Sequence, residues 1–213
     1  MRTVKFGDLD SYIDLGLIRN GVTIGQASPK TEAVDVPGSD GSLDLTEYFG
    51  EIFYQNREIA FSFSVIPSDG VTFHDVFTRV KNALHGKRLK IILSEDADYY
   101  YVGRITCDEW KTNETIGTME ITADCDPYKY RLTPTAIMLS ISGTATKVFM
   151  NERKRAVPTF ELSSAMQIKQ GTTTYQAAAG TWSDSRLYFS QGNNELTFTG
   201  TGTVKITYQE ASL

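Results

Sequence analysis

The strictest pattern in the chain is an alternation of apolar and small residues over residues 59–65. Its apolar positions are Ile59, Phe61, Phe63 and Val65, and the residues between them are Ala60, Ser62 and Ser64. Side chains that alternate with a period of two point to opposite faces of a strand. The pattern therefore predicts a half-buried β-strand, and any fold of this chain must give that strand one covered face.

The composition favours β structure for the rest of the chain. Eleven Tyr and eleven Phe accompany frequent Thr, residue types that are enriched in strands. The 213 residues suffice for one large or two small domains, and 40% hydrophobic with 22% charged residues is ordinary for a globular protein. No apolar run approaches the roughly 20 residues that a membrane helix needs, so we expect no membrane insertion.

One segment has the period of a helix. Thr72 and Asp75 have the spacing of a capping box, and Gly86 is placed to end the helix. Between them lies a single apolar stripe, formed by Phe73, Val76, Phe77, Val80 and Leu84. We predict one amphipathic helix that packs on a sheet.

A proline-rich and glycine-rich break divides the region before residue 59. Val34 and Val36 flank Asp35 in a short strand pattern, and the sequence PGSDG follows at residues 37–41. Proline and glycine fit poorly inside a sheet ladder, so this segment is predicted to be a turn between strands.

The residues around 132–135 are the predicted domain boundary, which gives domains 1–134 and 135–213. Pro127 precedes this stretch and Pro134 lies within it, and the balance of charge changes sign across it. In the second domain, turn signals that include Gly200–Gly202 separate short strand patterns. These patterns predict a small antiparallel sandwich with strands at 147–150, 157–162, 167–169, 172–177, 186–190, 196–199 and 204–208.

The formal charge of −5 is unevenly distributed. Residues 1–134 contain 14 Lys/Arg against 21 Asp/Glu, a balance of −7, and residues 135–213 contain 7 against 5, a balance of +2. An acidic domain repels a nucleic-acid backbone, which disfavours a role in gripping DNA. It would not prevent DNA from sliding past.

The two cysteines are too far apart to be bridged in the predicted fold. If residues 99–110 and 115–125 form a hairpin about residues 112–114, Cys107 lies opposite residue 119. Cys125 is then about 20 Å further along, beyond the ~7 Å between Cα atoms that a disulfide requires. We expect two reduced thiols.

No group of residues predicts catalysis, a cofactor or a metal. His74 and His85 lie about 16 Å apart on the predicted helix, too far to share an ion. The acidic residues Asp35, Asp40, Asp44 and Glu47 do not have the spacing of an EF-hand loop. The chain also lacks the G-x-S-x-G elbow of a serine hydrolase.

Three stretches resemble the distal tail proteins (Dit) of long-tailed, non-contractile bacteriophages. They are VDVPGSDGSLDLTEYFGEIFYQNREIAFSF at 34–63, LHGKRLKIILSEDADYYYVGRI at 84–105 and QGNNELTFTGTGTVKITYQEASL at 191–213. The resemblance covers nearly the whole chain in the expected order. It implies an N-terminal domain of β-sheets with one helix that forms a ring of six copies, and a C-terminal galectin-like β-sandwich.

The resemblance also implies where the subunits of such a ring meet. We expect the contact in the region of residues 35–58 and the first strand. The interface candidates are Val34, Asp35, Pro37, Gly38, Asp40, Gly41, Leu43, Tyr48, Tyr54 and Arg57. Trp182 is a candidate contact for a partner or a glycan, although a tryptophan is more often a core or rim residue.

The implied role is a structural, non-enzymatic hub at the tip of a phage or prophage tail. Its partners would be further copies of itself in single or stacked rings, the tail tube protein, the tip protein or tail-associated lysin, and a receptor-binding protein. DNA would pass the channel without specific binding, and the protein would be made in the host cytoplasm. Three alternatives remain. The first is a carbohydrate-binding adhesion module, which glycan binding by residues 136–213 would favour. The second is a small hydrolase, which would need a pH-dependent activity that is lost on changing an Asp or Glu. The third is another tube or hub component.

Overall fold

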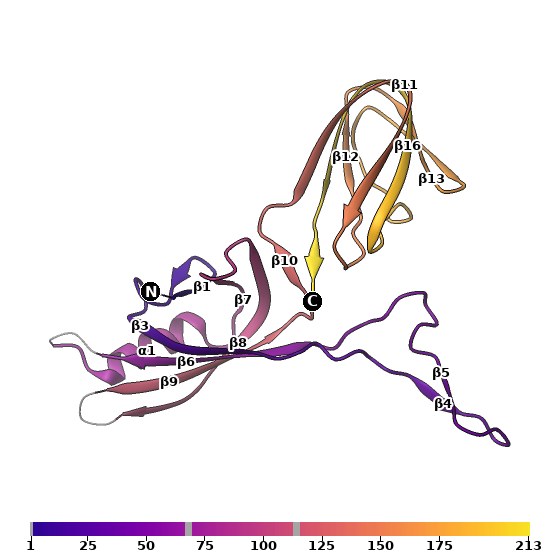
Figure 1. Ribbon diagram of the computed structural model, residues 1–213. Helices are drawn as coiled ribbons and strands as arrows, with labels where there is room; N and C mark the ends of the chain where they lie inside the picture. Colours follow the sequence, from indigo (N-terminus) through magenta and orange to yellow (C-terminus); the bar gives the residue numbers. More distant parts are fainter. Residues whose placement is uncertain (1, 67–69, 113–115) are drawn as a thin grey trace. The chain divides into compact units, whose positions relative to one another are not determined.

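The computed structural model describes residues 2–66, 70–112 and 116–213, and they form two compact units that divide between Lys129 and Tyr130. Strands dominate both units, and the described residues contain one α-helix (Figure 1), so the prediction of a mainly β chain with one helix is confirmed. The division falls slightly before residue 134 because the backbone of Arg131 already bonds to Glu210, at 3.0 Å.

The first unit is built on one antiparallel sheet with the strand order β2-β1-β7-β8-β9-β6-β3. Strand β6 covers the predicted strand and extends it by two residues. The strands are β1 Val4–Phe6, β2 Leu9–Asp10, β3 Leu17–Ile24, β6 Arg57–Val65, β7 Arg88–Leu93, β8 Tyr99–Thr112 and β9 Gly117–Cys125. A separate two-stranded ribbon pairs β4 Ala33–Asp35 with β5 Ser42–Asp44.

This sheet curls until its two ends share one core. Phe6 lies on β1, which three strands separate from β6 in the sheet order, yet its ring packs edge-on against Phe61 with 5.4 Å between centroids. Phe63 lies 6.4 Å from the same ring. The alternating apolar side chains of β6 therefore form the centre of the first unit, and all four are buried.

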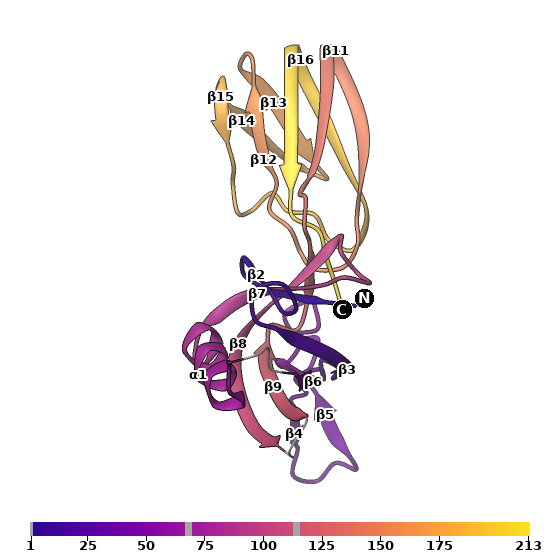
Figure 2. The same cartoon turned by 90° about the vertical axis from the view of Figure 1, so that its left-hand side faces the viewer.

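Helix α1, Phe73–Leu84, covers the core on one side of the sheet (Figure 2). The capping box forms as predicted, with the Thr72 hydroxyl accepting from the Asp75 N–H at 3.1 Å and Asp75 accepting from the Thr72 N–H at 3.0 Å. Hydrogen bonds from the Thr72 side chain and backbone hold the pKa of Asp75 below its ordinary value. Val76, Val80 and Leu84 are the buried residues of the predicted stripe.

A register shift in β8 corrects the predicted pairing of the cysteines. Cys107 lies opposite Ile121 rather than residue 119, because the pairing shifts between Cys107 and Trp110. Cys125 lies opposite Gly103, and both thiols are free and buried. The predicted turn at 112–114 falls mostly outside the described residues.

The second unit is a β-structure whose strand order is β14-β13-β16-β12-β15, with β11 along the other side of β16. Phe149, Phe160, Phe189 and Phe198 are among its buried residues. Its strands are β11 Thr135–Asn151, β12 Thr159–Leu162, β13 Met166–Gln170, β14 Thr173–Ala177, β15 Gly180–Trp182 and β16 Gly192–Tyr208. Two short strands, β10 Lys129–Arg131 and β17 Ala211–Ser212, pair with each other outside this sheet.

Two predictions for this unit are wrong. The segment Gly200–Gly202, expected to be a turn, lies inside the 17-residue strand β16, and residues 135–146 belong to a second 17-residue strand, β11. Gly200 and Gly202 have φ of 152° and 145°, so they bend the strand without ending its ladder to β11. The predicted strand at 186–190 is reduced to an isolated bridge between Ala156 and Phe189.

We expect Gly202→Ala to destabilise the second unit. An added Cβ would lie 2.5 Å from Ser163 Oγ and 2.6 Å from Ser164 Oγ, in addition to the strain of a positive φ. The free energy of unfolding, measured by urea denaturation, should fall by about 1–3 kcal/mol. The control Gly171→Ala has a positive φ but nothing within 4 Å of its Cβ, and should cost less. Equal losses in both variants would refute the steric argument.

Candidate interaction surfaces

Residues 26–56, here called the arm, leave the main sheet between β3 and β6 and contain the ribbon β4–β5 (Figure 1). The stem of the arm is held by backbone bonds of 2.8 Å from Lys30 N–H to the Phe53 carbonyl and from Gln55 N–H to the Ser28 carbonyl. None of its side chains is buried. The arm therefore has no core of its own, and its surface is available to another molecule.

The arm exposes more apolar area than a polar loop would. Tyr48 and Phe49 are 75% and 79% exposed, and their rings pack edge-on with 5.3 Å between centroids. Further exposed apolar side chains of the arm are Val34, Val36, Leu43 and Phe53. Contiguous exposed apolar surface on a soluble protein marks a site of interaction with another molecule.

A hollow of about 490 Å³ lies beside these aromatic rings. Its lining combines apolar side chains with one basic and one acidic side chain. The lining residues are Lys30, Glu32, Leu45, Thr46, Tyr48, Phe49 and Phe53. A hollow of this composition suits an apolar side chain or a short peptide segment from a partner.

The structure gathers most of the predicted interface residues on the arm. Val34, Asp35 and Leu43 lie on the ribbon, and Tyr48 lies beyond it. The turn 37–41, which joins β4 to β5, contributes Pro37, Gly38, Asp40 and Gly41. Tyr54 lies in the stem, where its ring packs against Tyr128 at 5.9 Å.

Arg57 does not belong to this surface. It begins β6, is only 5% exposed, and its Cζ lies 5.8 Å from the centre of the Tyr101 ring. Its Nε and Nη2 atoms are buried without a hydrogen-bond partner. The Arg57 side chain is therefore buried where the arm ends and β6 begins, and it is not part of the exposed surface of the arm.

Sequence reasoning missed Val36, Phe49 and Phe53. The signal was present in Tyr48-Phe49, two adjacent aromatic side chains that lie in a turn, where their rings pack on each other and do not enter a core. Periodicity alone did not identify the hollow, because its lining residues come from two segments, one before β4 and one after β5.

A second surface is the outer side of the curled sheet, opposite the apolar side chains of β6 and β9. We call it the polar face. It consists of Glu58, Ala60, Ser62 and Ser64 of β6, Thr118, Glu120, Thr122 and Asp124 of β9, and Arg104, Thr106, Asp108 and Lys111 of β8. Small and hydroxylated side chains dominate it, and its carboxylates outnumber its basic groups.

Hydrogen bonds order this polar face. The Thr122 hydroxyl donates to Asp108 Oδ2 at 2.7 Å, and Asn20 of β3 donates to the Ser64 hydroxyl at 2.9 Å. Ser62 lies opposite Glu120, and Ser64 opposite Thr118. The result is a hydroxyl-rich surface with a negative balance of charge.

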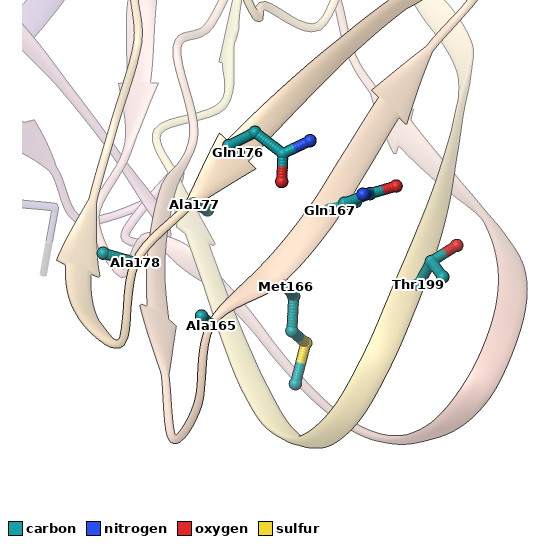
Figure 3. A pocket seen from close by; sticks show the side chains of 7 residues that line it. All are labelled: Ala165, Met166, Gln167, Gln176, Ala177, Ala178 and Thr199. Atoms are coloured by element: carbon teal, nitrogen blue, oxygen red, sulfur yellow. The ribbon is translucent and has the colours of Figure 1, made fainter.

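The second unit carries an open hollow of about 480 Å³ (Figure 3). Gln176, Gln167 and Thr199 lie opposite one another on β14, β13 and β16, and their uncharged polar side chains border the hollow. Trp182 is not part of its lining. Its ring is half-buried against Phe160 at 5.5 Å and Tyr175 at 5.8 Å, which matches the rim or core position considered above.

Several features bear on chemistry. Among the described residues, no group of three or more His, Cys, Asp or Glu side chains is placed to hold a metal ion. Burial raises the pKa of Cys107 to about 11 and that of Cys125 to about 12, so neither is a thiolate nucleophile at neutral pH.

His85 has a structural contact: its Nδ1 accepts a hydrogen bond from the backbone N–H of Cys107 at 3.1 Å. No helix in the described ranges has the length and apolar character to cross a membrane.

We expect Arg57→Met to change the free energy of unfolding by less than about 1 kcal/mol, measured by urea denaturation. The variant loses the contact with Tyr101 but also removes buried nitrogens that lack a partner. The control is Arg19→Met, because Arg19 donates to both Glu95 carboxylate oxygens at 2.7 and 2.8 Å. A loss for Arg57→Met as large as that for Arg19→Met would show that Arg57 is paired in solution.

Comparison with known proteins shows which fold these surfaces belong to. No protein-family model matches the sequence, and no curated protein matches it. Among solved structures, the chain is similar to the Dit protein (gp 19.1) of phage SPP1, described as a paradigm of the hub adsorption apparatus in phages that infect Gram-positive bacteria. The two share 18% identity over 100% of each chain, with a TM-score of 0.68. The resemblance to distal tail proteins is therefore confirmed at the level of the fold, over the whole chain.

Proposed function

We propose that this protein is a structural hub of a phage or prophage tail tip, in which six copies form a ring between the tail tube and the tip protein. The full-length match to a distal tail protein of the hub adsorption apparatus is the observation that carries the proposal. The two surfaces of the first unit supply the physical means, one for joining subunits and one for lining a channel.

The arm supports a closed ring. Subunits in a ring meet through a heterologous interface, in which one patch contacts a different patch on the neighbour. A projecting segment with exposed Tyr48 and Phe49 and no core of its own is suited to be one of these patches. If a neighbouring subunit covered these aromatic rings, the contact would be stabilised by about 25 cal/mol for each Å² of apolar area removed from water.

The polar face supports a channel for DNA. A surface that lets DNA slide should offer no cluster of Lys and Arg to the phosphates, because phosphate contacts dominate non-specific binding. The polar face presents four carboxylates, Glu58, Asp108, Glu120 and Asp124, among hydroxyl groups. These outnumber its two basic side chains, Arg104 and Lys111. We place it towards the lumen, where it repels the DNA backbone without binding it.

The remaining roles follow from this position in the tail. The tail tube protein would dock on one side of the ring, and the tip protein or tail-associated lysin on the other. The second unit would offer a docking site for a receptor-binding protein. The protein would reside in the virion tail and act through geometry, without catalysis.

The solution mass of the purified protein, measured by light scattering with negative-stain images, tests the ring. We expect a species whose mass is a multiple of six subunits and which appears as rings. If the protein alone gives no ring, the same measurement is repeated with the tip protein. Absence of six-fold particles in both cases would overturn the proposal.

We expect the paired substitution Tyr48→Ser/Phe49→Ser to abolish ring formation in the same measurement. Because both side chains are exposed, the stability of the subunit should change by less than about 0.5 kcal/mol. The control is Ile13→Ser, which removes an exposed apolar side chain of the first unit outside the arm and should leave the ring intact. Rings that persist in the arm variant would exclude the arm as the contact.

We expect Glu120→Lys to make the assembled protein retain duplex DNA at low salt, measured by co-sedimentation. The substitution places a cation on the polar face in every copy, and the retention should disappear as salt is raised. Glu195→Lys makes the same change of charge at an exposed position of β16 in the second unit. Equal retention by both variants would contradict the placement of the polar face in the channel.

A further inference from the structure

Strand β11 leaves one complete edge without a partner in the described chain. All 17 of its residues, Thr135–Asn151, pair with β16 on one side. The neighbours of β16 on its other side are β12 and β13, so β11 is an edge strand of the sheet. Figure 1 shows β11 and β16 curving together over the second unit.

This edge has few of the features that normally prevent strands from pairing between molecules. Exposed edges are usually short or interrupted by charges, proline or bulges. β11 is long, contains no proline and pairs with β16 without a register shift. Its interruptions are one charged residue, Lys147, and a bend at Gly143, whose φ is 82°. Exposed apolar side chains stand near both ends, with Met138 at 72% exposure and Val148 and Met150 beyond the middle. Such an edge is a template for a further strand.

The exposed side chains of β11 are symmetric about Gly143. In chain order the even-numbered positions are Ala136, Met138, Ser140, Ser142, Thr144, Thr146, Val148 and Met150, and all are exposed. Apolar residues occupy the two ends, and hydroxylated residues occupy the middle. An antiparallel copy centred on Gly143 would set Met138 opposite Val148, and Ser140 opposite Thr146.

The inward side chains match in the same register. Ile141 would lie opposite Ala145 of the second copy, and Ile137 opposite Phe149. Leu139 would lie opposite Lys147, whose alkyl stem can cover it. In the single chain Ile137, Leu139 and Ala145 are only partly buried against the core, so a second copy would complete their burial.

We propose that two copies of this chain associate through β11, antiparallel and centred on Gly143, so that their second units share one continuous sheet. Partners in this register are both even-numbered or both odd-numbered, so exposed side chains stay on the exposed face and core side chains on the core face. Lys147, the one charged residue of β11, would lie opposite Leu139 of the second copy and not opposite the second Lys147. A two-fold interface of this kind cannot join neighbours within one ring, so it would connect two rings or, without rings, two chains.

Disulfide trapping tests the register. In the double variant Ser140→Cys/Thr146→Cys, each new thiol would lie opposite the other residue of the second copy, about 5 Å away between Cα atoms, within the range of a disulfide. Oxidation should give a covalent dimer that a reductant reverses. The control Ser140→Cys/Met150→Cys has the same number of new thiols on the same face but out of register, and should stay largely uncrosslinked. Equal cross-linking in both, or none in the first, overturns the proposal.

The solution mass tests the association itself. Ser142→Lys/Thr144→Lys places like charges opposite each other at the centre of the pair, on exposed positions, and should halve the mass of the wild-type species. Ser142→Glu/Thr144→Glu should do the same, and a mixture of the two variants should restore the original mass. These outcomes hold whether the first unit forms rings or not, because a stacked ring falls to a single ring and a dimer to a monomer. An unchanged mass in both variants excludes pairing through β11.

Discussion

The alternation of side chains along β6 is the constraint on which the first unit depends. Ile59, Phe61, Phe63 and Val65 are buried, and the residues between them are small or hydroxylated. The buried set holds the curled sheet together, since Phe61 and Phe63 contact Phe6 from the far end of the strand order. The same alternation leaves a polar surface on the other side. A slip of one residue in the register would exchange the two faces and lose both the core and the polar face.

The arm, in contrast, has no buried side chains to hold it together. It leaves the sheet from the ends of β3 and β6 and is ordered by backbone bonds at its stem and by the short ribbon β4–β5. A two-stranded ribbon without a core is marginal in water. Its exposed aromatic side chains then act against solubility unless another molecule covers them. The proposed assembly would explain both features, because the apolar surface that lowers the solubility of the isolated subunit would stabilise the contact.

Much of this fold follows from local patterns. The strand at 59–65, the capping box of Thr72 and Asp75, and the turn at 37–41 are each dictated by a few neighbouring residues. The bend at Gly200–Gly202 is not, because glycines that could form a turn are continued as strand by the ladder to β11, a contact distant in sequence. The shift in β8 similarly depends on which residues of β9 lie beside it. Arg57 was predicted to be an interface residue because a sequence pattern cannot show that it is buried beside Tyr101.

The candidate surfaces were accessible to sequence reasoning to different degrees. The arm could be located, since its turn and its aromatic pair stand out, but only the structure shows that its ribbon is separate from the main sheet. The polar face could be read from Ser62, Ser64 and Glu120 only once β6 and β9 were known to be neighbours. Residues that act together in a surface come from strands whose pairing is a tertiary property.

An electron cryomicroscopy reconstruction of the assembled protein tests the central claim most directly. The account predicts a six-fold ring in which β6, β8 and β9 present the polar face to the central hole and the arm of each subunit lies against its neighbour. A ring with the polar face turned outward, or with the arms extended into solvent, would contradict it.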